Sequence, residues 1–133
     1  MIENNCLPAS VIELNNLDEL KFYLTGSRYF NNTTSDSDWD FYTTFCAGAV
    51  AYFKTHDWVE TDCYSFDNVE RIFRKGGVDV MLVQSVKKTT LIQESLKVFP
   101  NFTYATKENR TLIWDFAYHL FDAGVSFSKV AGN

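Results

Sequence analysis

A pair of glycines, Gly76 and Gly77, separates two segments whose composition is typical of β-strands. Residues 69–75 precede the pair and residues 78–84 follow it, and both segments are rich in apolar and β-branched side chains. Paired glycines supply the positive φ angles that a tight two-residue turn requires. The sequence therefore predicts a β-hairpin at this point.

Further elements are expected before the hairpin. Strands are predicted over residues 21–25, 39–45 and 58–65, and the second of these is strongly aromatic and β-branched. Helices are predicted over residues 9–17 and 46–57. Ser10 and Glu13 have the spacing of a capping box at the start of the first helix. Residues 28–37 are rich in Asn, Thr, Ser and Asp, so they are expected to form a turn or loop.

Two helices are expected after the hairpin. Thr90 and Gln93 again have capping-box spacing. Apolar residues then recur at helical intervals, first at Ile92, Leu96 and Phe99 and later at Ile113, Phe116, Ala117 and Leu120, with an end near Gly124. The element order predicts an α+β fold in which helices pack on a small mixed β-sheet. All three tryptophans are expected in the core, namely Trp39, Trp58 and Trp114.

Composition limits the classes of function. With 133 residues the chain suits one domain, and no run of 18 apolar residues offers a membrane span. No export signal is recognised at the N-terminus, so a cytoplasmic location is expected. A net charge of −5 argues against non-specific nucleic-acid binding, but it is compatible with a nucleotide whose phosphates are carried by metal ions. The scattered cysteines are expected to be buried free thiols: Cys6, Cys46 and Cys63.

Two aspartates alternate with aromatic residues at the start of the predicted strand 39–45. Asp38 and Asp40 should point to one face of that strand, while Trp39 and Phe41 point to the other, into apolar packing. Neighbouring carboxylates repel each other and lose hydration, and a divalent cation offsets both effects. Because Mg²⁺ commonly binds one or two carboxylates together with substrate phosphates and water, this fragment indicates a magnesium site.

Asp79 is a third acidic residue, placed inside an apolar strand. Val78 and Val80 share one face of that strand and Asp79 takes the other. An Asp in such a position is rare unless it is paired or bound to a metal. If this strand lies beside residues 39–45, the three carboxylates converge, and two metals about 4 Å apart can stabilise an in-line phosphoryl displacement. The alternative is a solvated acidic turn formed by Asp36, Asp38 and Asp40, with Asp79 on an edge strand.

Gly26 and Ser27 follow the predicted strand 21–25. Glycine lets the backbone approach a phosphate closely, and the Ser27 hydroxyl and nearby amides can donate hydrogen bonds to it. A triphosphate also needs a cationic partner besides metal, and one of the basic residues around the Asp79 strand can supply it. The alternative for each of these is a solubilising surface role: Arg71, Arg74, Lys75, Lys87 and Lys88.

The order of these fragments resembles the signature of the DNA-polymerase-β nucleotidyltransferase superfamily. That signature has a hydrophobic residue, Gly and Ser, a spacer, and two Asp that alternate with hydrophobic residues. Here it reads Leu24-Thr25-Gly26-Ser27, residues 28–37, and Asp38-Trp39-Asp40-Phe41. The family's third acidic residue lies on a later strand, a place that Asp79 fits. The closest similarity is to minimal bacterial and phage members.

The resemblance implies a polymerase-β-like fold over residues 1–133, with the motif core at 20–84 and C-terminal helices at 89–124. It implies Mg²⁺-dependent transfer of a nucleoside monophosphate from a nucleoside triphosphate, with ATP as the expected donor, to a hydroxyl on a protein, small molecule or RNA end. The implied metal ligands and catalytic residues are Asp38, Asp40 and Asp79, in a two-metal site. The implied nucleotide contacts are Gly26, Ser27 and Arg28.

The resemblance also implies a setting in a bacterial cell or a phage-infected host. Minimal family members often act as antitoxins, so the resemblance implies a partner toxin as one protein acceptor. The competing interpretation is a non-catalytic binding module that uses the same fold to inhibit or neutralise a partner protein, for example as a phage or antitoxin factor.

Overall fold

The structure is a computed structural model that describes residues 7–30, 37–62, 68–97 and 106–124. Contacts divide the chain into two compact units, Met1–Val86 and Lys87–Asn133, and each is described by itself. The motif core predicted at 20–84 lies in the first unit, and the helices predicted at 89–124 lie in the second. A single domain over residues 1–133 stays a prediction.

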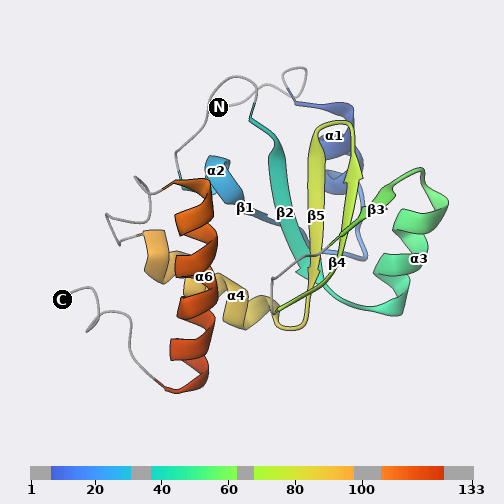
Figure 1. The fold of residues 1–133 in the computed structure, drawn as a ribbon. Helices are drawn as coiled ribbons and strands as arrows, with labels where there is room; N and C mark the ends of the chain where they lie inside the picture. The colour runs from blue at the N-terminus through green and yellow to red at the C-terminus, as the bar shows by residue number, and fades with distance from the viewer. Residues whose placement is uncertain (1–6, 31–36, 63–67, 98–105, 125–133) are drawn as a thin grey trace. The chain divides into compact units, whose positions relative to one another are not determined.

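The first unit contains a five-stranded sheet with the strand order β1-β2-β5-β4-β3 (Figure 1). β2 and β5 are parallel, and the other neighbouring pairs are antiparallel. The prediction of an α+β fold with a mixed sheet is therefore confirmed. The strands are β1 (Tyr23–Thr25), β2 (Trp39–Thr44), β3 (Val59–Thr61), β4 (Val69–Lys75) and β5 (Val78–Val83).

The predicted hairpin is formed by β4 and β5. Lys75 and Val78 pair directly across the turn. Gly76 and Gly77 have φ angles of 55° and 77°, which side-chain-bearing residues adopt only at a steric penalty. The two glycines thus set the register of the whole hairpin, as their sequence position predicts.

Two helices, α1 (Ala9–Asn15) and α3 (Ala47–Thr55), pack against one face of this sheet. Val11 and Leu14 come from α1, and Ala49 and Phe53 come from α3. They meet the inward side chains of the strands in the core, which are Phe41, Phe73, Val78, Val80 and Leu82. Trp58 is buried in the same core and Trp39 packs against it, which confirms two of the three tryptophan predictions.

The segment after β1 differs in part from its prediction. Residues 28–37 were expected to be a loop, but Gly26–Tyr29 form the short helix α2 directly after β1. The Phe30 amide donates to the Gly26 carbonyl and closes this single turn. The rest of the predicted loop, residues 31–36, lies outside the described residues, as does much of the predicted strand end beyond Thr61.

The capping box predicted at Ser10 and Glu13 is wrong. α1 begins at Ala9, as predicted, so Ser10 lies inside the helix, and no side chain caps its first amides. Proline suits the residue before a helix because its φ is fixed and it has no amide hydrogen to satisfy. Glu13 is then free of a capping role and binds three side chains from other elements instead, as described below.

The second unit contains α4 (Val86–Lys97) and α6 (Lys107–Asp122). The capping box predicted at Thr90 is wrong because α4 starts four residues earlier and includes Thr90. α6 has a side-chain cap that was not predicted: the Thr106 hydroxyl accepts from the Asn109 amide at 3.2 Å. The Thr89 and Tyr118 hydroxyls bond to each other at 2.6 Å and join the two helices.

Burial in the second unit agrees only partly with the predicted pattern. Ile92, Leu96 and Ala117 are buried as expected, whereas Phe116 is 60% exposed. Tyr118 takes the inward position instead. Phe99 lies outside the described residues. Of the helices that the structure describes, none is long and apolar enough to cross a membrane.

Candidate functional site

The two central strands bring two of the predicted carboxylates together. Asp40 on β2 is the direct neighbour of Asp79 on β5, in a parallel pairing that also joins Trp39 to Val78. Directly paired residues in a sheet place their side chains on the same face. Asp40 and Asp79 therefore share one face, although 38 residues separate them in the sequence.

The alternation of faces along both strands is as predicted. Val78 and Val80 are fully buried in the core, and Asp79 between them points away from it, with its side chain 16% exposed. Asp38 lies one residue before β2 and is exposed, while Asp40 is partly buried. β5 is the central strand of the sheet, so the alternative that placed Asp79 on an edge strand is wrong.

Gly26 brings the backbone against the Asp40 carboxylate. Thr25, the last residue of β1, pairs with Asp40, and Gly26 follows with a φ of 69°. A Cβ at this position would lie 2.9 Å from the Asp40 Cβ and 3.0 Å from its Cγ, closer than real Cβ atoms approach. The glycine is thus required both for its backbone angle and for space, and it places α2 with Ser27 beside this carboxylate.

Arg28 is held by contacts within the first unit. Its guanidinium lies over the Trp39 ring, 4.2 Å from the ring centroid, and its Nη2 donates to the Ser37 carbonyl at 2.7 Å. These contacts join α2 to the segment that carries Asp38. They give Arg28 a structural function, and the nucleotide contact expected from the resemblance stays a prediction.

Arg74 contacts the acidic row, the name used here for Asp38, Asp40 and Asp79. It pairs directly with Asp79 across the hairpin, where its Nε donates to Oδ1 at 2.5 Å and its Nη2 to Oδ2 at 3.0 Å. The hydrogen bonds and charge of Asp79, with further contributions from the charges of Asp38 and Asp40, raise the pKa of Arg74. All three predicted carboxylates therefore act electrostatically on this one guanidinium.

The glycine pair contains a signal for this ion pair. A two-residue turn at Gly76 and Gly77 makes Lys75 the partner of Val78, and so makes Arg74 the partner of Asp79. The hairpin register thus distinguishes Arg74 from the other four basic residues around the Asp79 strand.

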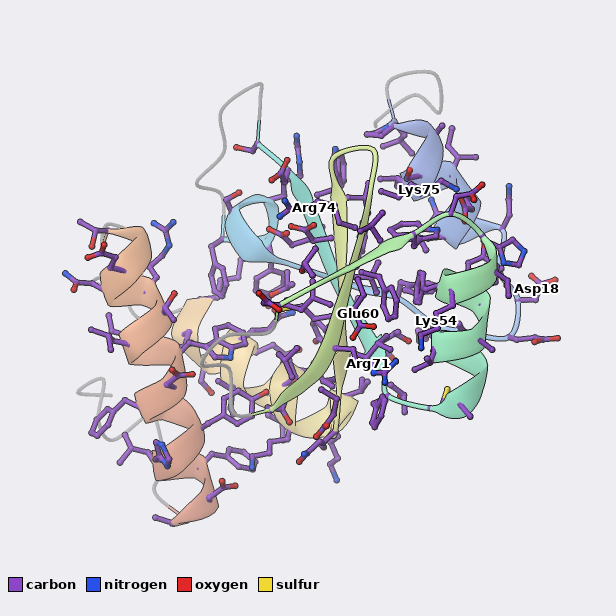
Figure 2. The ribbon with its side chains drawn as sticks, turned by 45° about the vertical axis from the view of Figure 1, so that its right-hand side comes forward. Asp18, Lys54, Glu60, Arg71, Arg74 and Lys75 are labelled. Atoms are coloured by element: carbon purple, nitrogen blue, oxygen red, sulfur yellow. The ribbon has the colours of Figure 1, made fainter. Side chains whose placement is uncertain are left out.

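Three of the other four basic candidates, Arg71, Lys75 and Lys88, form ion pairs elsewhere. The Arg71 Nε lies 3.6 Å from Glu60 Oε2, across β4 and β3 (Figure 2). Lys88 forms an ion pair with Asp122 inside the second unit. Lys75 binds Glu13 at 2.8 Å, on the side of the hairpin that faces α1 (Figure 2).

Glu13 is the centre of a second polar cluster, on the opposite side of the hairpin end from Arg74. Its Oε2 accepts from the Tyr52 hydroxyl at 2.5 Å and from the Trp58 Nε1 at 2.8 Å, and its Oε1 accepts from the Lys75 ammonium. Lys75 also donates to the His56 carbonyl at 2.9 Å. The cluster ties α1 and α3 to β4 and to the start of β3.

The residues of the acidic row fit a magnesium ion by the chemistry of their donors. They are hard carboxylate oxygens on one face of two adjacent strands, next to a glycine that leaves the backbone close to one of them. Over the four described ranges, however, no three His, Cys, Asp or Glu side chains are grouped closely enough to hold a metal ion as they stand. The cation beside Asp79 in this structure is the guanidinium of Arg74.

Comparisons of this chain with models of protein families, with curated proteins and with solved structures gave no match.

Proposed function

We propose that this chain is a Mg²⁺-dependent nucleotidyltransferase, which moves a nucleoside monophosphate from a nucleoside triphosphate, with ATP as the expected donor, to a hydroxyl on a protein, small molecule or RNA end. The observation that carries the proposal is the direct pairing of Asp40 with Asp79 on the two central strands, beside Gly26. A polymerase-β-like fold and a site of action in the cytoplasm of a bacterium or phage-infected host are parts of the same proposal.

The proposed roles come from the resemblance to the nucleotidyltransferase superfamily, and the pairing of Asp40 with Asp79 supports them. Asp38 and Asp40 would hold Mg²⁺, and Asp79 would add a third carboxylate from the neighbouring strand. The amides after Gly26 and the Ser27 hydroxyl would donate to phosphate oxygens. When bound, the metal ions neutralise phosphate charge and lower the pKa of the acceptor hydroxyl.

The reaction is an in-line displacement at the α-phosphorus. The acceptor oxygen forms a bond to that phosphorus as the bond to the bridging oxygen of the β-phosphate breaks, and pyrophosphate leaves. Asp79 would either hold the metal that lowers the pKa of the acceptor hydroxyl or accept the proton that this hydroxyl releases.

Transfer from labelled triphosphates tests the proposal. The purified chain is incubated with each of the four α-labelled triphosphates, Mg²⁺ and a cell lysate, and labelled products are identified. We expect one or more labelled acceptors with wild type and none with the D38A/D40A double variant. Absence of labelling with all four triphosphates and both Mg²⁺ and Mn²⁺ would count against the enzyme.

One observation favours the competing function, a non-catalytic module that grips a partner protein. Arg74 binds Asp79 through two hydrogen bonds, and a scaffold with no catalytic use for this carboxylate would also need such a partner. Thermal unfolding distinguishes the two, because a ligand that binds only the folded state raises the melting temperature. A module would give no rise with triphosphate and Mg²⁺, whereas the enzyme gives a rise that D38A/D40A loses.

A further inference from the structure

The Arg74–Asp79 pair is built from a sheltered acceptor and an exposed donor. The Asp79 side chain is 16% exposed and fixed on the central strand, whereas the Arg74 side chain is 57% exposed. The two residues are direct neighbours in a hairpin that its backbone bonds already hold together. Arg74 can therefore leave Asp79 without disturbing the sheet, while Asp79 cannot follow it.

Arg74 lies beside a group of carboxylates. Asp40 and Asp79 are direct neighbours on β2 and β5, Asp38 lies two residues before Asp40, and Arg74 pairs directly with Asp79. Without a nearby cation such a group of carboxylates repels itself. Arg74 supplies that cation from within the chain.

From this geometry, and resting on the proposed function, we propose that Arg74 is an exchangeable counter-ion: a divalent cation displaces it from Asp79, and the released guanidinium then binds the phosphates of the nucleotide. A guanidinium suits both partners, because its planar fork binds carboxylate and phosphate alike through two parallel hydrogen bonds. The exchange keeps the site neutralised before the nucleotide arrives and provides a phosphate ligand afterwards.

The exchange predicts that one substitution changes the affinities for two ligands in opposite directions. R74Q removes the competitor for Asp79, so binding of Mn²⁺ alone, measured by electron paramagnetic resonance, should tighten on the order of fivefold. In saturating Mn²⁺ the same variant should bind a non-hydrolysable ATP analogue about tenfold more weakly, because a charged donor to phosphate is lost. A purely structural role for Arg74 would move neither affinity in this paired way.

Arg71 provides the matched control. It lies on the same strand and pairs with Glu60, so R71Q removes an equal charge away from Asp79 and should leave both affinities unchanged. In a D79N background the effect of R74Q on Mn²⁺ affinity should disappear, because the two substitutions then act on one interaction.

The outcomes separate this inference from the function on which it rests. If wild type binds Mn²⁺ and D40N does not, but R74Q leaves Mn²⁺ or nucleotide affinity unchanged, the exchange is wrong and the nucleotidyltransferase stands. Equal tightening by R71Q and R74Q would also overturn the exchange, since net charge alone would explain it. If neither wild type nor R74Q binds Mn²⁺, both proposals fail.

Discussion

Arg74 and Lys75, adjacent residues at the end of β4, lie on opposite sides of the hairpin (Figure 2), and each forms an ion pair with different surroundings. Lys75 and its partner Glu13 belong to a cluster in which Tyr52 and Trp58 also donate to the carboxylate, and these groups come from separate elements. Arg74 instead binds Asp79, its direct neighbour on β5. One pair connects parts of the fold that the backbone leaves apart, and the other joins strands that are already paired.

Because side chains alternate between the two faces of a strand, neighbouring residues of β4 can have different functions: Lys75 stabilises the fold, and Arg74 lies with the carboxylates of the proposed site. The Lys75 side is tied to α1 and α3 by several hydrogen bonds, so any change there should alter stability. The Arg74 side carries the three carboxylates, so changes there should alter ligand binding and transfer. Substitutions on each side test whether this division holds.

The largest effect is expected from D79N. The substitution keeps the shape of the side chain and removes its charge, so transfer of labelled nucleotide should fall by about a hundredfold or more, on the scale of general-base and metal effects. The melting temperature should remain within a few degrees of wild type, because the pair with Arg74 is partly exposed. Undiminished turnover would show that the carboxylate of Asp79 is only a structural partner of Arg74.

A methyl group at Gly26 should displace the backbone beside Asp40 and so disturb the side of the sheet that carries Asp40 and Asp79. G26A meets the Asp40 carboxylate and must adopt a φ of 69°, so the free energy of unfolding should drop by about 1–2 kcal/mol or more and transfer should fall with it. G48A is the control, since a Cβ there meets nothing within 4 Å and the position is inside α3. Urea unfolding should find G48A more stable than wild type by roughly 0.5–1 kcal/mol. Equal behaviour of the two variants would contradict the close approach at Asp40.

A smaller effect, on the structural side, is expected from E13Q. The variant keeps the size of Glu13 but loses the charge that three donors share, so the free energy of unfolding should fall by about 1–2 kcal/mol in urea titrations. Mn²⁺ affinity should not change, because Glu13 lies on the other side of the hairpin end from Asp79. Weakened Mn²⁺ binding in a folded E13Q protein would remove the distinction between the two sides.

The pH dependence of stability should also differ between wild type and E13Q. Burial alone would raise the pKa of Glu13, but hydrogen bonds from Lys75, Tyr52 and Trp58 outweigh it, and the pKa is lowered from 4.5. A lowered folded-state pKa means that the stabilisation is present above pH 4.5 and is lost as the pH falls through the folded-state value. Wild type should therefore lose stability below pH 4.5 more steeply than E13Q; parallel curves would contradict this.

Short-range patterns in the sequence predicted the mixed sheet and the outward placement of two acidic side chains. Alternation placed Asp40 and Asp79 away from the core, and the glycine pair located the β4–β5 turn, because both patterns act over a few residues. The sequence alone does not establish that β5 lies beside β2. This placement depends on a crossover through α3, β3 and β4 that no local pattern encodes.

The predictions that failed concern side chains whose partners lie far away in the sequence. Glu13 had the spacing of a capping residue, but Trp58 and Lys75, 45 and 62 residues further on, bind it instead. Phe116 matched the helical repeat of α6 and is exposed, while Tyr118 is buried and bonds to Thr89. In both cases tertiary contacts outweighed a local preference, as is usual for isolated motifs.

The parallel pairing of β2 with β5 determines when, during synthesis of the chain, Asp40 and Asp79 can become neighbours. A nascent chain that has left the ribosome only as far as β4 has Asp40 but lacks its neighbour, and β2 then has an open edge. The two aspartates become adjacent only after residue 79 has emerged and β5 has inserted between β2 and β4. Neither half of the sequence, expressed as a separate fragment, would contain this pair, so the ability to gather its carboxylates should appear together with the completed sheet.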